Sequence, residues 1–216
     1  GTQFGYVTTN GTDAVFKFTY DPATGALTSV GGDAGTEFID LAAPTDAASK
    51  GVGPIGLAVA FDTSHKVLFT NNDISRNVSA VDLPTQHVAG GTSPAVAQSS
   101  ALPTDDLGKS RLAGKKFFNT GLARWSLKGQ GWGACQSCHT DGLTDNVTWY
   151  FARGPRQSIS LDGSFSNDGN EQRILNWTAI FDEVADGENN SRGVSGGVGA
   201  LVSAATPPTD PANRIN

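Results

Sequence analysis

The sequence predicts a mixed fold in two parts: a β-rich N-terminal part, followed by a mainly α C-terminal part with long loops. Between residues 14 and 20, aromatic side chains alternate with smaller or polar ones, the period of a strand with one buried face. After residue 104 the pattern changes to a helical one. The 27 glycines and 10 prolines among 216 residues favour many turns and short elements.

The β-rich part covers residues 1–84 and contains two partly similar units. The first contains expected strands at 6–10, 14–20 and 26–30, and the second contains expected strands at 66–72 and 77–83. These units resemble β-propeller repeats with a Tyr-Val-Thr-Asn signature, because Tyr6-Val7-Thr8-Thr9-Asn10 and Leu68-Phe69-Thr70-Asn71-Asn72 occupy the signature position. Two units cannot close a propeller. We therefore expect the missing blades in a longer parent chain, or another chain that completes the sheet.

The segment 85–104 is expected to be a linker, since Ala, Ser, Thr, Pro and Gly dominate it. The second part, 105–216, begins with a helix. Thr104 offers a capping hydroxyl, acids follow it in the first turn, and Gly121 is the expected stop. A second helix is expected at 171–185, where four apolar residues form one stripe, and the tail from Ser191 is expected to be loops.

Charge and composition exclude several classes of protein. The net charge of −6 and the pI near 4.9 argue against a nucleic-acid partner. No segment approaches the ~20 apolar residues that span a bilayer, so we expect no membrane span. No signal peptide is visible and there is no Met, which suggests a processed product or a fragment.

One motif points to chemistry: Cys135-Gln136-Ser137-Cys138-His139. Covalent haem attachment needs two thiols three positions apart for the two vinyl groups, and a His directly after the second Cys to bind the iron. Both cysteines of the chain lie in this motif. The sequence therefore predicts one covalent haem c, with His139 as an axial iron ligand.

Three other uses of a C-x-x-C pair remain open at this point. A disulfide between Cys135 and Cys138 would close a very short loop. A thioredoxin-like site would follow a strand and open a helix, whereas this motif follows the Gly-rich loop 129–134. A structural zinc site would need further ligands, and the chain has no third Cys.

The segment around the motif resembles the di-haem cytochrome c peroxidase and MauG-like family over about residues 105–200. Gly114-Lys115-Lys116-Phe117-Phe118 precedes the motif by a loop typical of that family. After it, 140–146 resembles the family's x-D-G-x-T-D stretch, and 154–161 its G-x-R-x-x-P-S-L stretch, with Ile159 in place of Pro. The resemblance implies a haem domain with peroxidase-type relatives. Members of the family bind two haems, whereas this chain carries one motif.

The second axial ligand is left open by the sequence. His/Met ligation from this chain is excluded, because it contains no Met. His87 is the preferred distal candidate and His65 the weaker one. Tyr150 and an open or water-bound site are the other options. Arg153 and Arg156 are candidates for pairing with the haem propionates, because a guanidinium matches a carboxylate bidentately.

These features favour a mono-haem electron-transfer cytochrome that serves a redox partner protein or a neighbouring haem subunit. The alternative is a MauG-like peroxidase or oxygenase, or a fragment of a di-haem enzyme. A third hypothesis treats the β part as an assembly module that forms an oligomer or a multi-subunit complex through exposed strand edges. The expected location is periplasmic, cell-surface or extracellular in a bacterium.

Overall fold

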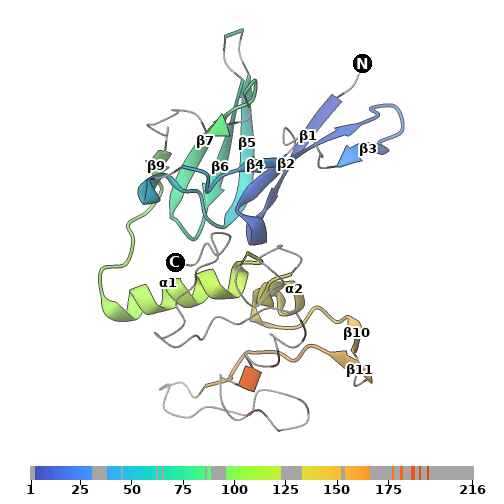
Figure 1. The fold of residues 1–216 in the computed structure, drawn as a ribbon, viewed down its shortest axis with the longest axis vertical. Helices are drawn as coiled ribbons and strands as arrows, with labels where there is room; N and C mark the ends of the chain where they lie inside the picture. The colour runs from blue at the N-terminus through green and yellow to red at the C-terminus, as the bar shows by residue number, and fades with distance from the viewer. Residues whose placement is uncertain are drawn as a thin grey trace. The chain divides into compact units, whose positions relative to one another are not determined.

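A computed structural model of the chain describes residues 3–30, 38–44, 46–61, 63–64, 66–85, 87–88, 96–122, 133–151 and 154–165, and the isolated positions 177, 181, 186–187, 190 and 194. The chain divides into two compact units, Gly1–Lys116 and Phe117–Asn216. Figure 1 shows both units and labels their main helices and strands.

The first sheet of unit 1 is built on a long hairpin. Strands β1 (Gln3–Thr9) and β2 (Ala14–Tyr20) pair antiparallel along their whole length. The other edge of β2 is shared by β3 (Leu27–Val30) and β4 (Phe38–Asp40), which pair with different halves of it. The alternating pattern at 14–20 therefore correctly predicts the central strand of this sheet.

The second sheet of unit 1 has the order β5 (Pro54–Phe61), β6 (Lys66–Asn72) and β7 (Asn77–Asp82), all antiparallel and side by side in Figure 1. Two short strands, β8 (His87–Val88) and β9 (Val96–Gln98), pair with the outer edge of β7. Both lie inside the segment expected to be a linker. A turn-rich composition does not prevent short pairing where a neighbouring strand presents unpaired backbone groups.

The core of unit 1 lies between the two sheets. Val15 and Ile39 come from the first sheet and Leu68 and Val81 from the second, and all four are almost fully buried. Leu41 and Leu83 complete the cluster. Burying one such side chain contributes about 1.5–3 kcal/mol. The two sheets therefore stabilise each other through one shared hydrophobic cluster.

A buried polar network lies beside this core at the ends of β6 and β7. The side-chain amide nitrogen of Asn72 donates to Asn77 Oδ1 (2.9 Å) and to Ser79 Oγ (2.8 Å), and its oxygen accepts from Thr70 Oγ1 (3.0 Å). Asn77 in turn donates to the carbonyl oxygens of residues 48 and 50. These side chains are satisfied within the fold, as buried polar groups must be.

Asp13 connects the two sheets through its backbone and its carboxylate. It adopts a left-handed conformation (φ 52°) just before β2 and is almost fully buried. Its carbonyl oxygen accepts the N–H of Leu41 (3.0 Å), and its Oδ1 accepts the N–H of Gly53 (2.9 Å) at the start of β5.

The Asp13 carboxylate also affects the pKa of Lys116. Burial lowers the pKa of Lys116, and the negative charge of Asp13 acts in the opposite direction.

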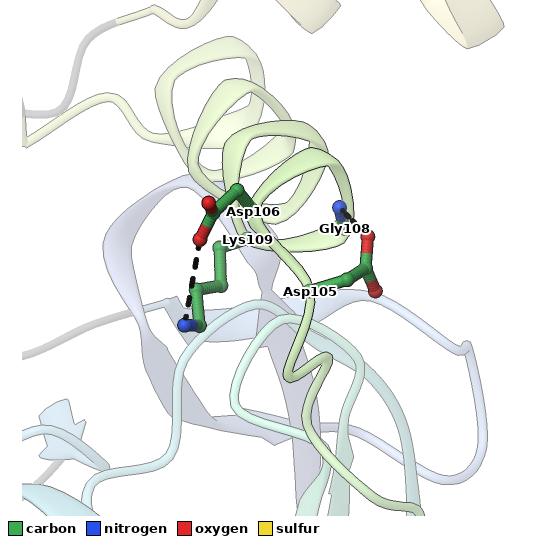
Figure 2. Close-up of polar contacts among 4 residues, drawn as sticks. All are labelled: Asp105, Asp106, Gly108 and Lys109. Carbon is green, nitrogen blue, oxygen red and sulfur yellow. Dashed lines mark hydrogen bonds and ion pairs between the residues drawn. The ribbon is translucent and has the colours of Figure 1, made fainter.

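Helix α1 (Asp106–Asn119) confirms the helix expected after residue 104. Its N-terminus is capped by Asp105, whose Oδ1 accepts the N–H of Gly108 (2.8 Å), as Figure 2 shows. The expected hydroxyl cap, Thr104, is one residue too early. A carboxylate at this place also interacts favourably with the helix dipole. An ion pair between Lys115 and Asp73 links α1 to the β6–β7 turn.

Unit 2 is described around the C-x-x-C-H motif. It contains the one-turn helix α2 (Cys135–Cys138), the 3-10 turn η4 (Thr140–Gly142) and a hairpin of β10 (Thr148–Phe151) and β11 (Gly154–Gln157). The described residues of this unit do not support a mainly α domain. The Thr-Trp-Tyr-Phe run has high strand propensity, and Gly154, at φ 100°, allows the tight return.

The helix expected at 171–185 lies outside the described residues, apart from single positions within it. In the part of the chain that the structure describes, no helix has the length and apolarity needed to cross a membrane.

Candidate functional site

Helix α2 places the two cysteines on one side of a single turn. Positions i and i+3 of a helix are neighbours on its surface, and the N–H of His139 donates to the carbonyl of Cys135 (2.9 Å), which closes the turn. The turn is held at its start by Ser137, whose Oγ accepts the N–H of Ala134 (3.0 Å). The motif is therefore a compact unit that presents both thiols and the His together.

The two thiols are free and partly buried. Burial raises the pKa of the Cys135 thiol, and the neighbouring Cys138 adds to the increase. Burial also raises the pKa of Cys138, with a further contribution from the Asp145 charge. Both groups are therefore neutral thiols near neutral pH. A redox-active C-x-x-C instead depends on a lowered thiol pKa, so the electrostatics of this turn differ from those of a thioredoxin-like site.

The imidazole of His139 is held by backbone carbonyls. Its Nδ1 lies 2.8 Å from the carbonyl oxygen of Ile159 and 3.3 Å from that of Leu143. A carbonyl oxygen can only accept a hydrogen bond, so these contacts assign the proton to Nδ1. The other ring nitrogen, Nε2, then carries the lone pair. Metal-binding histidines have the same arrangement, in which a hydrogen bond from the other ring nitrogen fixes the tautomer and the ring orientation.

The Ile159 carbonyl is itself positioned by a network around Asp145. Ser158 donates to Asp145 Oδ1 (2.8 Å) and the Trp149 indole donates to Oδ2 (2.7 Å). Burial raises the pKa of Asp145, but hydrogen bonds from Val147 N–H, Ser158 and Trp149 outweigh it, so this pKa lies below its usual value. The network ties the residue before Ile159 to the loop that follows the motif.

Two backbone hydrogen bonds also connect the motif and the turn after it to the residues around Asp145 and Ile159, and we call these contacts together the frame of the site. The N–H of Asp145 donates to the carbonyl of Cys138 (3.2 Å), and the N–H of Leu161 donates to the carbonyl of Gly142 (2.8 Å). Sequence reasoning did not identify Asp145 as the acceptor at the centre of the frame. The sequence signal that could have identified it is its position directly before Asn146, since Asn favours turns. In the structure Asn146 does adopt a left-handed conformation (φ 56°).

Large apolar side chains of this unit are exposed. All of β10 is exposed, with Tyr150 84% accessible. Grouped exposure of large apolar residues is typical of binding sites in soluble proteins. The exposed large apolar residues of unit 2 are Leu143, Val147, Trp149, Tyr150, Phe151, Phe165, Trp177 and Val194.

The structure brings Cys135, Cys138 and His139 together and places Arg156 on β11, opposite Trp149. The Arg156 side chain is exposed, and its Nη1 donates to the carbonyl of Pro155 (2.8 Å). Arg153 and His65 lie outside the described residues.

The distal ligand therefore stays a prediction. The backbone of His87 pairs with Asp82 in β8, but its side chain is not among those described. Tyr150 is exposed on β10. Within the described ranges, no three or more His, Cys, Asp and Glu side chains are grouped so that they could hold a metal ion.

Comparison of the chain with protein-family models, with curated proteins and with solved structures finds no match. The resemblance to the di-haem peroxidase family and to propeller repeats therefore rests on the residues quoted for it.

Proposed function

We propose that this chain is a mono-haem c-type cytochrome that transfers electrons. The observation that carries the proposal is the contact of His139 Nδ1 with the Ile159 carbonyl at 2.8 Å. It leaves Nε2 with a free lone pair at the end of a turn that also presents two neutral thiols.

The residues present fit a covalent haem. Each thiol of Cys135 and Cys138 would add its sulfur and its hydrogen across one vinyl double bond, giving two thioethers. His139 would bind the iron through Nε2. The haem, when bound, supplies a one-electron Fe(III)/Fe(II) couple. The exposed aromatic side chains of β10 suit contact with an apolar ring.

The chain's own residues would then tune that couple. The hydrogen bond from Nδ1 to Ile159 makes the imidazole a better donor and fixes its ring plane. Arg156, exposed on β11, is the described candidate for a haem propionate, and Arg153 is the second. His87 remains the preferred distal ligand, ahead of His65 and Tyr150.

We further propose an extracytoplasmic location and a redox partner protein or a neighbouring haem subunit. Covalent haem attachment in bacteria takes place outside the cytoplasm, which supports the first point. The resemblance of residues 105–200 to the MauG-like family supports a haem domain, and a single motif favours electron transfer over two-haem peroxidase turnover.

The direct test is covalent attachment. The chain is expressed with the haem-attachment machinery of a bacterial periplasm, denatured, and measured for haem that stays with the polypeptide. We expect one haem per chain, and loss of all covalent haem in Cys135→Ala/Cys138→Ala. Gln136→Ala, within the same turn, is the matched control and retains the haem. Haem that extracts freely from the unmodified chain would refute the proposal.

The spectrum then decides between electron transfer and enzymatic turnover. A low-spin ferric spectrum that is indifferent to CO and peroxide supports a saturated iron and electron transfer. A high-spin component that binds CO or reacts with peroxide refutes the electron-transfer proposal in favour of a peroxidase or oxygenase. Loss of the low-spin spectrum in His87→Ala would assign the distal ligand.

A further inference from the structure

The two sheets of unit 1 are repeats of one another. The hairpin β1–β2 closes through residues 10–13, between the paired residues Thr9 and Ala14. The hairpin β6–β7 closes through residues 73–76, between Asn72 and Asn77. Each loop ends in a left-handed non-glycine residue, Asp13 at φ 52° and Arg76 at φ 53°. The two hairpins therefore share the same four-residue loop length, the same register at the loop and a left-handed last loop residue.

The short outer strands repeat as well. β4 pairs with Ala14–Phe16 of β2, and β9 pairs with Asn77–Ser79 of β7. β3 and β8 pair further along the same edges. One backbone hydrogen bond beyond the short strands is also repeated. The carbonyl of Asp13 accepts the N–H of Leu41 (3.0 Å), and the carbonyl of Arg76 accepts the N–H of Ser99 (2.9 Å). β5 alone has no counterpart among the described strands of the first sheet.

The contact between the sheets uses a different face of each. Side chains of residues that pair directly on neighbouring strands point to the same side of the sheet. The pairing therefore divides the side chains of each sheet between two faces, here named face A and face B, and the same positions form each face in both sheets. Face A carries Tyr6, Val15 and Ile39 in the first sheet, and the equivalent Phe69, Val78 and Ala97 in the second. Face B carries Leu68, Val81 and Leu83 in the second sheet, and the equivalent Gly5, Phe18 and Tyr20 in the first. The core joins face A of the first sheet to face B of the second.

Large apolar side chains are exposed on the opposite faces, although the small Ala80, which pairs with Phe69, is buried. On face A of the second sheet, Phe69 is 39% exposed, although the equivalent Tyr6 packs against the core. On face B of the first sheet, Val7 is 44% exposed beside Phe16 and Phe38, which form an edge-to-face pair. The Phe18 ring also covers Gly5 there, and so occupies the volume that Leu68 fills in the other sheet.

We propose that a second copy of this chain docks head to tail on unit 1, with face A of its second sheet against face B of the first sheet. The occupant is a second copy because the chain carries both halves of an interface that it already forms once internally. Such an interface is heterologous, so repeated addition gives a ring if the rotation closes and a filament if it does not. This assembly is independent of the proposed haem chemistry.

Sedimentation velocity of the full chain over a range of concentrations tests the proposal. We expect the unmodified chain to form a concentration-dependent oligomer. Phe69→Glu on face A and Val7→Glu on face B should each give a monomer. Leu102→Glu, at an exposed position outside both sheets, is the matched control and keeps the oligomer. Circular dichroism confirms that each variant is folded, and Ala58→Glu and Leu27→Glu replace any variant that is not.

Mixing the two variants gives the decisive result. Each retains the face that the other has lost, so the mixture should form a one-to-one dimer and nothing larger. An unmodified chain that stays a monomer at every concentration would overturn the proposal and leave these faces to another segment or protein. Oligomers that survive both substitutions, or a mixture that stays monomeric, would overturn it equally.

Discussion

The Nδ1 atom of His139 lies 2.8 Å from the carbonyl oxygen of Ile159, a residue 20 positions later in the chain. The contact depends on a backbone oxygen, so it requires no particular side chain at position 159. Ser158, next to it, donates to Asp145. The orientation of the proposed iron ligand is thus linked to a carboxylate that does not touch it.

Asp145→Asn should destabilise unit 2 in a pH-dependent way. Burial raises the pKa of Asp145, but the hydrogen bonds to its carboxylate outweigh this effect and lower the pKa. A carboxyl group with a lowered folded pKa adds stability above its unfolded value of about 3.9, and loses it as the pH falls through the folded value. Urea unfolding followed by tryptophan fluorescence should therefore show a difference from the parent at neutral pH that disappears in acid.

Asp141→Asn removes the same charge from an exposed position in the adjacent turn and is the control for net charge. A difference between Asp145→Asn and the parent that persisted unchanged below the folded pKa would show that the loss comes from something other than the ionised carboxylate.

Asn72→Ala should cost about 2–4 kcal/mol of unfolding free energy, because it leaves buried partners of the Asn72 side chain unpaired and opens a cavity. Asn72 is 0% exposed and bonds to three side chains. The neighbouring, exposed Asn71→Ala should change stability by less than about 0.5 kcal/mol. Equal losses for the two variants in urea unfolding would contradict a structural role for the network.

Gly5→Val should destabilise unit 1 by about 1–3 kcal/mol, since a Cβ at Gly5 would overlap the ring of Phe18. Gly56→Val on β5 is the matched control, because a Cβ there meets nothing within 4 Å. Thermal unfolding followed by circular dichroism compares the two. A control that loses as much as Gly5→Val would mean that strand glycines, and not the aromatic ring, set the cost.

Gly142→Ala should destabilise the motif region by about 1–3 kcal/mol through backbone strain alone. Gly142 has φ 79°, and a Cβ there has open space around it. Its N–H donates to the carbonyl of His139 (2.8 Å), so strain at Gly142 should also weaken this bond at the end of the motif. Gly133→Ala is the control, because a Cβ there also has open space around it and the backbone φ of Gly133 is not positive. An unchanged melting temperature for Gly142→Ala would refute the strain argument.

Much of unit 1 could be predicted from local patterns. The strand at 14–20 was readable, because side-chain alternation is a local property. The sequence match of residues 6–10 with 68–72 is one residue out of register with the hairpins, in which Thr9 and Asn72 occupy the same place before the loop. The pairing of β8 and β9 with β7 was not readable. Short polar strands carry almost no pattern of their own, and their conformation depends on a neighbour's free edge.

The sequence by itself determined the chemistry available at the candidate site. Two thiols and an imidazole at positions 135, 138 and 139 lie within one turn in any helical conformation, because their spacing is local. Only the tertiary structure decided the state of those groups. The tautomer of His139 depends on Ile159, and the raised pKa of Cys135 depends on its burial in the folded chain. Such contacts join residues distant in the chain, and their geometry arises from packing, which no local pattern encodes.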